Sequence, residues 1–86
     1  MTLPKNGGIR EGLYIGVGRL ISSTRKRKGF SQAQFAKALG ITRTALGNIE
    51  QGRSMVKVNK LVRMGMILRS PIHLLIPKEF LYEALS

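Results

Sequence analysis

Two short helical patterns separated by three residues constrain the fold of this chain more than any other feature. The first pattern covers residues 32–39 and the second residues 43–51, and only Gly40, Ile41 and Thr42 lie between them. A connection of this length that contains glycine makes two helices cross steeply. The sequence therefore predicts a helix-turn-helix unit near the middle of the chain.

Capping signals predict where both helices begin. Ser31 followed three residues later by Gln34 is the pattern of a capping box, and Phe30 with Phe35 can form a hydrophobic staple across it. Thr42 is a suitable N-cap for the second helix. Each start is thus predicted from a side chain that can accept from the free N–H groups of the first turn.

The rest of the chain is also helical in pattern, and no strand is predicted. An apolar stripe begins at Leu13 and ends in a basic run closed by Gly29. Further helices are expected over residues 58–68 and residues 71–76. We therefore expect an all-α, compact five-helix domain over residues 13–76, a flexible arm over residues 1–12, and a short C-terminal helical tail over residues 77–86.

The charge indicates the kind of partner and the composition excludes several functions. Fifteen Lys and Arg face four acidic residues, which gives a net charge of +11 and indicates a polyanionic ligand. The chain has no cysteine, no aspartate and one histidine, so the common catalytic constellations and Cys-based metal sites cannot be assembled. We expect no enzyme activity, no cofactor and no metal.

Membrane and export signals are not predicted. The apolar stretch from Leu13 to Ile21 is interrupted by Gly16, Gly18 and Arg19, which makes it a poor signal peptide. No window reaches the roughly 18 apolar residues that a spanning helix needs. We expect a cytoplasmic, nucleoid-associated protein that makes no membrane contact.

Several segments resemble the Cro/cI-type (XRE) helix-turn-helix family of phage and bacterial repressors. The matching segments are Gly18-Arg19-Leu20-Ile21, Lys28-Gly29-Phe30-Ser31-Gln32, residues 36–43 and Asn48-Ile49-Glu50-Gln51-Gly52-Arg53. The resemblance covers about residues 17–76 and implies a lambda-repressor-like fold that binds double-stranded DNA as a homodimer. The chain departs from the family pattern at Thr24, at Gly65 and in the loop over residues 54–57.

The outward face of the second helix of the pair carries no large apolar side chain. A helix in the major groove needs hydrogen-bonding groups there: Arg43 can pair with guanine and Asn48 with adenine. A solvated polar face is the alternative reading. The expected base-contacting residues are Arg43, Thr44, Gly47, Asn48 and Gln51.

Phosphate contacts are expected around this helix. Gln32 lies in the first turn of the first helix of the pair, beside unpaired N–H groups that suit an anion. The full set of expected phosphate contacts is Gln32, Arg53, Lys57, Arg27 and Lys28. Other cations, among them Arg10, Arg19 and Lys26, either reach the DNA backbone or remain solvated.

Glu50 requires a compensating partner, because it lies in the last turn of a helix, where the macrodipole disfavours an acid. The family resemblance implies an ion pair between Arg25 and Glu50 that ties the first helix to the recognition helix. A contact from Glu50 to a cytosine amine is the less favoured alternative, since Glu50 lies at the wrong end of the helix.

Apolar residues near the C-terminus exceed what a small domain can bury, so they are candidates for a dimer interface. These residues are Ile72, Leu74, Leu75, Ile76, Phe80 and Leu81. The alternative is that the tail folds back over the core of its own protomer.

The sequence as a whole predicts a transcriptional regulator, a repressor or autoregulator, that binds a palindromic operator as a dimer. An antitoxin or restriction-modification controller whose C-terminal segment binds a partner, such as a toxin or polymerase, is the alternative. A single-strand or RNA binder is less favoured, because it would need exposed aromatic side chains for stacking. The five aromatic residues here mostly fall at core or staple positions.

Overall fold

The computed structural model describes residues 8–85, with side chains from Gly12 to Leu81. Within this range the chain is helical and contains no strand, which confirms the all-α prediction. The elements are α1 (Gly8–Arg27), α2 (Gln32–Leu39), α3 (Arg43–Glu50), α4 (Val58–Leu68), the 3-10 helix η1 (Ile72–Leu75) and α5 (Lys78–Leu85). Of the described helices, none is long and apolar enough to cross a bilayer.

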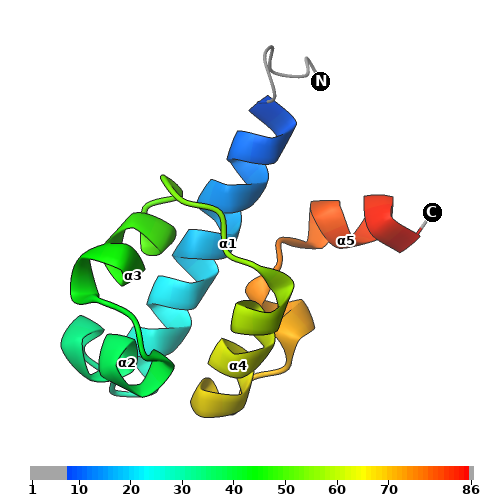
Figure 1. Cartoon of the computed structure of the whole chain (residues 1–86). Coiled ribbons are helices and arrows are strands. Elements are labelled where there is room, and N and C mark those ends of the chain that lie inside the picture. The colour runs from blue at the N-terminus through cyan, green and yellow to red at the C-terminus, as the bar shows by residue number, and fades with distance from the viewer. Residues whose placement is uncertain (1–7, 86) are drawn as a thin grey trace.

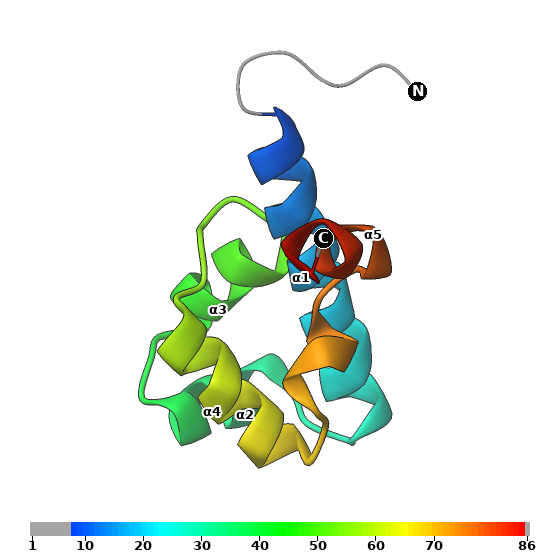
Figure 2. The same cartoon turned by 90° about the vertical axis from the view of Figure 1, so that its right-hand side faces the viewer.

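The long helix α1 is the centre of the arrangement (Figure 1). Helix α3 packs on α1 and on α2, η1 packs on α1 and on α4, and α4 also contacts α2. Figure 2 shows η1 between α1 and α4, which agrees with its contacts to both helices. The core forms where these elements meet, from Val17, Ile21, Phe35, Ala36, Leu39, Leu46, Ile49, Leu61, Met64, Leu68 and Leu75.

The predicted capping signals are confirmed in the structure. The Ser31 hydroxyl accepts from the N–H of Gln34 at 3.0 Å, and the Gln34 side chain accepts from the N–H of Ser31 at 2.9 Å. The rings of Phe30 and Phe35 lie 5.8 Å apart, as a staple requires. The Thr42 hydroxyl accepts from the N–H of Ala45 at 3.0 Å.

The turn between α2 and α3 depends on a left-handed residue at its start. Gly40 has φ 73° and ψ 29°, and its N–H reaches back to the carbonyls of Ala36 and Lys37. Only glycine adopts this conformation at little cost, so it ends α2 at once and lets Thr42 begin α3 two residues later.

Two glycines on α1 allow other segments to approach its backbone closely. A Cβ atom at Gly18 would lie 2.4 Å from the carbonyl oxygen of Ile49, and one at Gly16 would lie 2.5 Å from Cγ of Pro77. The end of α3 therefore packs directly on the α1 backbone, and the segment that leads to α5 does the same one half-turn away. Gly18 thus helps to set the position of α3.

Helix α1 starts earlier than predicted. The sequence pattern predicted a start at Leu13, but α1 begins at Gly8, so part of the expected flexible arm over residues 1–12 is helical. Gly12 lies next to α5, since a Cβ there would be 3.8 Å from Cζ of Phe80. The apolar periodicity of the sequence does not predict this tertiary contact. Residues 1–7 of the expected arm and residue 86 of the tail lie outside the described residues.

Candidate nucleic-acid interface

A buried ion pair joins α1 to the end of α3. Arg25 Nε donates to Glu50 Oε2 at 2.6 Å and Arg25 Nη2 donates to Glu50 Oε1 at 3.1 Å. Only 6% and 4% of the two side chains are exposed. The ion pair predicted between Arg25 and Glu50 is thus present, and its fork geometry is the strong form of an arginine–carboxylate contact.

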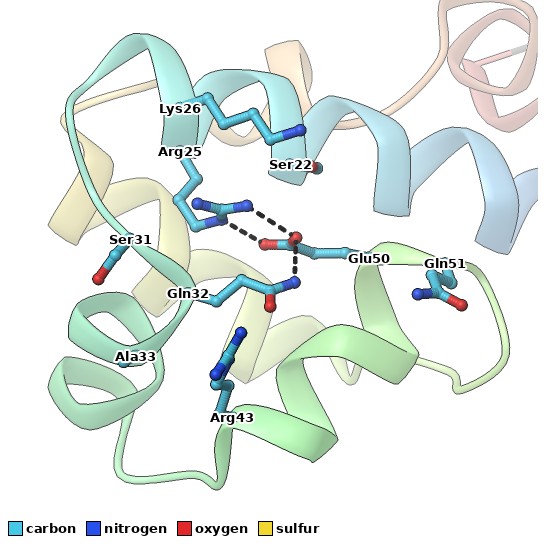
Figure 3. Close-up of a pocket in the computed structure, with 9 residues that line it drawn as sticks. All are labelled: Ser22, Arg25, Lys26, Ser31, Gln32, Ala33, Arg43, Glu50 and Gln51. Atoms are coloured by element: carbon cyan, nitrogen blue, oxygen red, sulfur yellow. Dashed lines mark hydrogen bonds and ion pairs between the residues drawn. The ribbon is translucent and has the colours of Figure 1, made fainter.

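Two further hydrogen bonds extend this ion pair, and Figure 3 shows the one from Gln32. Arg25 Nη1 donates to the carbonyl oxygen of Phe30 at 2.7 Å, just before α2 begins. Gln32 Nε2 donates to Glu50 Oε1 at 3.0 Å from the first turn of α2. The carboxylate of Glu50 therefore links α1, α2 and α3 at one point and fixes how the helix pair is oriented on the rest of the domain.

The outward side of α3 is polar and open. Arg43, Thr44 and Gln51 are exposed, whereas Gly47 and Asn48 are half-buried. These five residues, which the sequence assigned to base contacts, line one shallow hollow together with Gln32, of about 320 Å³. The structure therefore brings the whole predicted set, and the first residue of α2, to one surface.

A larger hollow of about 630 Å³ lies between the end of α1, the start of α2 and α3. Figure 3 shows Lys26 above the ion pair and Arg43 below Gln32, so cationic side chains stand on both sides of it. Ser22 also lines this hollow, one turn before Lys26 on α1. Sequence reasoning left Lys26 undecided and missed Ser22. Their spacing of four residues, which places both on one side of a helix, is the signal that could have found them.

The residues predicted to contact phosphate are spread around this surface. Arg53 is exposed after α3, and Lys57 is exposed as the N-cap residue of α4. Lys57 also lines a third hollow of about 380 Å³ together with Asn48. Arg27 and Lys28 are exposed at the end of α1, outside these hollows.

Gln32 lies where an anion at the start of α2 would be, but one amide hydrogen is already used. Its Nε2 atom donates to Glu50, and the side chain is half-buried. The second amide hydrogen is the one that a phosphate could accept. This bond could not be predicted from the sequence, because residues 32 and 50 approach only when α2 and α3 cross.

The residues predicted for a dimer interface do not form one exposed patch. Leu75 has no exposed surface and belongs to the core, so its assignment to the interface is wrong. The 3-10 helix turns Leu75 inward against α1 and α4 and leaves Leu74 outward, 50% exposed. Ile72, Ile76, Phe80 and Leu81 are half-buried.

A groove of about 440 Å³ lies beside Leu74, between α1 and the start of α5. Its apolar lining comes from Gly16, Leu20, Leu74, Ile76 and Pro77, and Arg19, His73, Lys78 and Glu79 complete it. Arg19 and Lys78 carry positive charge, and Glu79 carries a negative charge.

Comparisons with known proteins agree with this geometry. The helix-turn-helix family matches residues 21–75. The chain is 37% identical over 59 residues to the ImmF control region 10 kDa protein of Bacillus phage phi105, a match that covers 69% of this chain and 66% of that protein. It is 53% identical over 38 residues to the uncharacterized HTH-type transcriptional regulator YazB of Bacillus subtilis, with 44% and 55% of the two chains covered.

Solved structures share the fold. The restriction-modification controller protein C.AhdI from Aeromonas hydrophila superposes with a TM-score of 0.68 at 24% identity, over 72% of this chain and 94% of that one. The hydroxypropylphosphonic acid epoxidase from S. wedmorenis superposes with a TM-score of 0.74 at 24% identity, over 78% of this chain but only 36% of the epoxidase. The same fold therefore also occurs as part of a larger enzyme, and at this identity the likeness concerns the fold alone.

The family match spans most of the chain, and it includes the two capped helices, the turn at Gly40 and the ion pair of Arg25 with Glu50. The chain belongs to the helix-turn-helix family, in its Cro/cI (XRE) type.

Proposed function

We propose that this chain is a sequence-specific regulator of transcription that places α3 in the major groove of double-stranded DNA. The observation that carries the proposal is the shared hollow of Gln32 with Arg43, Thr44, Gly47, Asn48 and Gln51. This surface presents donors and acceptors and no large apolar side chain, and the net charge of +11 on the whole chain attracts phosphate. The regulators among its relatives support the same assignment.

The exposed residues of α3 suggest how bases are read. Arg43 stands at the start of α3, the end of a recognition helix that enters the groove in helix-turn-helix proteins. Its guanidinium can donate two hydrogen bonds to guanine, and the Asn48 amide can pair with adenine. Thr44 can bond a base or touch a thymine methyl group. Gly47 leaves room for the floor of the DNA groove to approach the helix. Gln51 lies at the margin of the α3 surface.

Phosphate contacts would surround this helix on both sides. Arg53 and Lys57 follow α3, while Arg27 and Lys28 precede α2, and all four side chains are exposed. Gln32 would add the amide hydrogen that Glu50 does not take. Contacts of this kind fix the register of the protein on DNA and make affinity depend on salt.

A palindromic operator would be bound by two copies of the chain, with their recognition helices about 34–36 Å apart. The groove beside Leu74 supports a pairing surface at η1 and the start of α5. Leu74 is half exposed at its edge, and Lys78 and Glu79 carry opposite charges that a two-fold axis can bring together. Ile76 lines this groove, and the half-buried Ile72, Phe80 and Leu81 would add apolar surface near it. Such a chain acts by occupying DNA and needs no catalytic group.

A salt titration of DNA binding tests the proposal. The full chain is titrated onto a duplex from the region upstream of its own gene and onto a scrambled duplex of equal length. A preference of about a thousandfold that persists at physiological salt is expected of a specific regulator. Equal and steeply salt-dependent binding to both duplexes would show only electrostatic attraction and would contradict specific readout at this operator.

A further inference from the structure

The outer side of α4 carries an apolar stripe that the fold leaves open. Val58, Val62 and Met66 are spaced four residues apart on one face of the helix, and they are 73%, 43% and 73% exposed. The opposite side of α4 buries Leu61, Met64, Gly65 and Leu68 in the core. At a rise of 1.5 Å per residue the stripe is about 12 Å long. We call these three residues the α4 stripe.

The α4 stripe is separate from the surfaces assigned to DNA and to the dimer. Its three residues line neither the two hollows that contain Arg43 nor the groove beside Leu74, all of which lie within the described part of the chain. Proposed DNA binding and pairing of two copies therefore leave the α4 stripe uncovered. Three exposed apolar side chains in register are the anchors that a helix lying in a groove or along a face would use.

The charges around the α4 stripe select the kind of helix that can cover it. From residue 51 to residue 77 the sequence contains no acidic residue, whereas it contains Arg53, Lys57, Lys60, Arg63 and Arg69. Arg63 and Arg69, which flank the stripe on α4 and at its C-cap, are exposed. A partner with acidic margins gains from these cations, and a basic one is repelled.

A second copy of the chain is disfavoured as the occupant by the same charges. Antiparallel pairing of two α4 helices about Val62 would bring the two Arg63 side chains to the same margin, with no carboxylate on α4 to separate them. Residues 1–7 of the chain contain no acidic residue either, so that segment does not supply the missing charge.

We infer that the α4 stripe binds an amphipathic helix of another protein, with apolar residues on one face and glutamate or aspartate along its margins. Val58, Val62 and Met66 contact the apolar face, and Arg63 and Arg69 pair with the acidic margins. Such a partner would reach the protein while α3 is engaged with DNA.

A designed peptide tests this inference on the full chain. The probe is a labelled 15-residue helical peptide with leucines spaced to form one face and glutamates along both margins. Its binding is followed by fluorescence anisotropy at physiological salt. Wild type is expected to bind it saturably, and the double variant Val58→Ser/Met66→Ser at least tenfold more weakly. Arg63→Glu is expected to weaken binding as well.

Controls separate the inference from general charge attraction and from folding defects. Met55→Ser removes another exposed apolar side chain, 62% exposed and outside α4, and is expected to bind the peptide as wild type does. A peptide with lysine in place of glutamate is expected not to bind. Thermal melting and binding to the DNA duplex are expected to be the same in the double variant and wild type, because both replaced residues are exposed.

Three results would overturn the inference. One is no saturable binding of the glutamate peptide to wild type, and another is equal affinity of the peptide for wild type and the double variant. The third comes from sedimentation: a wild-type dimer that becomes a monomer on Val58→Ser/Met66→Ser would show that a second copy covers the α4 stripe.

Discussion

The two sides of α3 are built for different tasks. On the inner side, Leu46, Ile49 and Glu50 are buried, and both carboxylate oxygens of Glu50 accept hydrogen bonds. On the outer side, Arg43 and Thr44 are exposed beside a shallow hollow. Within one helix of eight residues, side chains on the inner side stabilise the fold, and side chains on the outer side are free to contact a ligand. Substitutions on the inner side should therefore change the free energy of unfolding, and substitutions on the outer side should change the affinity for DNA.

The largest effect is expected on the inner side, from Glu50→Ala. This change leaves the buried Arg25 guanidinium without its carboxylate and removes the acceptor of Gln32, so the free energy of unfolding should fall by about 3–5 kcal/mol. Denaturant unfolding or thermal melting measures the loss. Gln51→Ala, an exposed neighbour, is the matched control and should change stability little. An unchanged melting temperature for Glu50→Ala would contradict the role of the ion pair.

Gly18→Ala should give the next largest loss of stability. Its Cβ would lie 2.4 Å from the carbonyl oxygen of Ile49 and 2.6 Å from that of Glu50, so α3 must shift away from α1. Overpacking of this kind costs about 1–3 kcal/mol. The same unfolding measurement applies, and a variant as stable as wild type would show that the contact between α1 and α3 is not tight. A small loss of specific DNA binding should accompany the shift of α3.

Arg43→Ala should affect the outer side without affecting the fold. If Arg43 reads a guanine, specific binding weakens by about 1–3 kcal/mol and preference relaxes at one base pair, while the melting temperature stays the same. Arg53→Ala is the control for a phosphate contact. It should weaken binding to all sequences alike and reduce the salt slope by about one unit. Identical behaviour of the two variants on specific and scrambled duplexes would argue against base readout by Arg43.

Gly47→Ala should give a modest change, and it separates the two sides of α3 clearly because stability is expected to rise while the affinity for specific DNA falls. A Cβ there would meet only Gln32 Nε2, at 3.9 Å, so the helix should gain about 1 kcal/mol. On the proposed DNA surface the added methyl group would point toward the groove floor and lower the specific affinity. If the variant is more stable and binds specific DNA as tightly as wild type, the floor of the DNA groove does not approach Gly47.

The helix pair could be predicted well because its signals are local. Ser31 with Gln34 and Thr42 act within one turn of their own helix, and Gly40 sets its own backbone conformation. The residues on the outer face of α3 can also be predicted from helical spacing alone, since a polar face that stays exposed depends on no contact with another segment.

Contacts between distant segments could not be predicted in the same way. Gly12 of α1 lies next to Phe80 of α5, and the bond from Gln32 to Glu50 depends on how α2 crosses α3. Leu75 and Leu74 are neighbours of the same residue type, and only the 3-10 turn against α1 and α4 decided which of them is buried.

The helix-turn-helix unit, its caps, the polar face of α3 and the basic charge follow from the sequence alone, because these depend on residues within a few positions of one another or on composition. The ion pair of Arg25 with Glu50 was implied by resemblance to a family and needed the fold to bring it together. The packing of the helices is needed to show that Gln32 joins this pair, that Leu75 lies in the core, and that the α4 stripe is exposed. Each of these depends on which segments approach in space, and apolar spacing along one chain specifies that a face is buried without specifying what covers it.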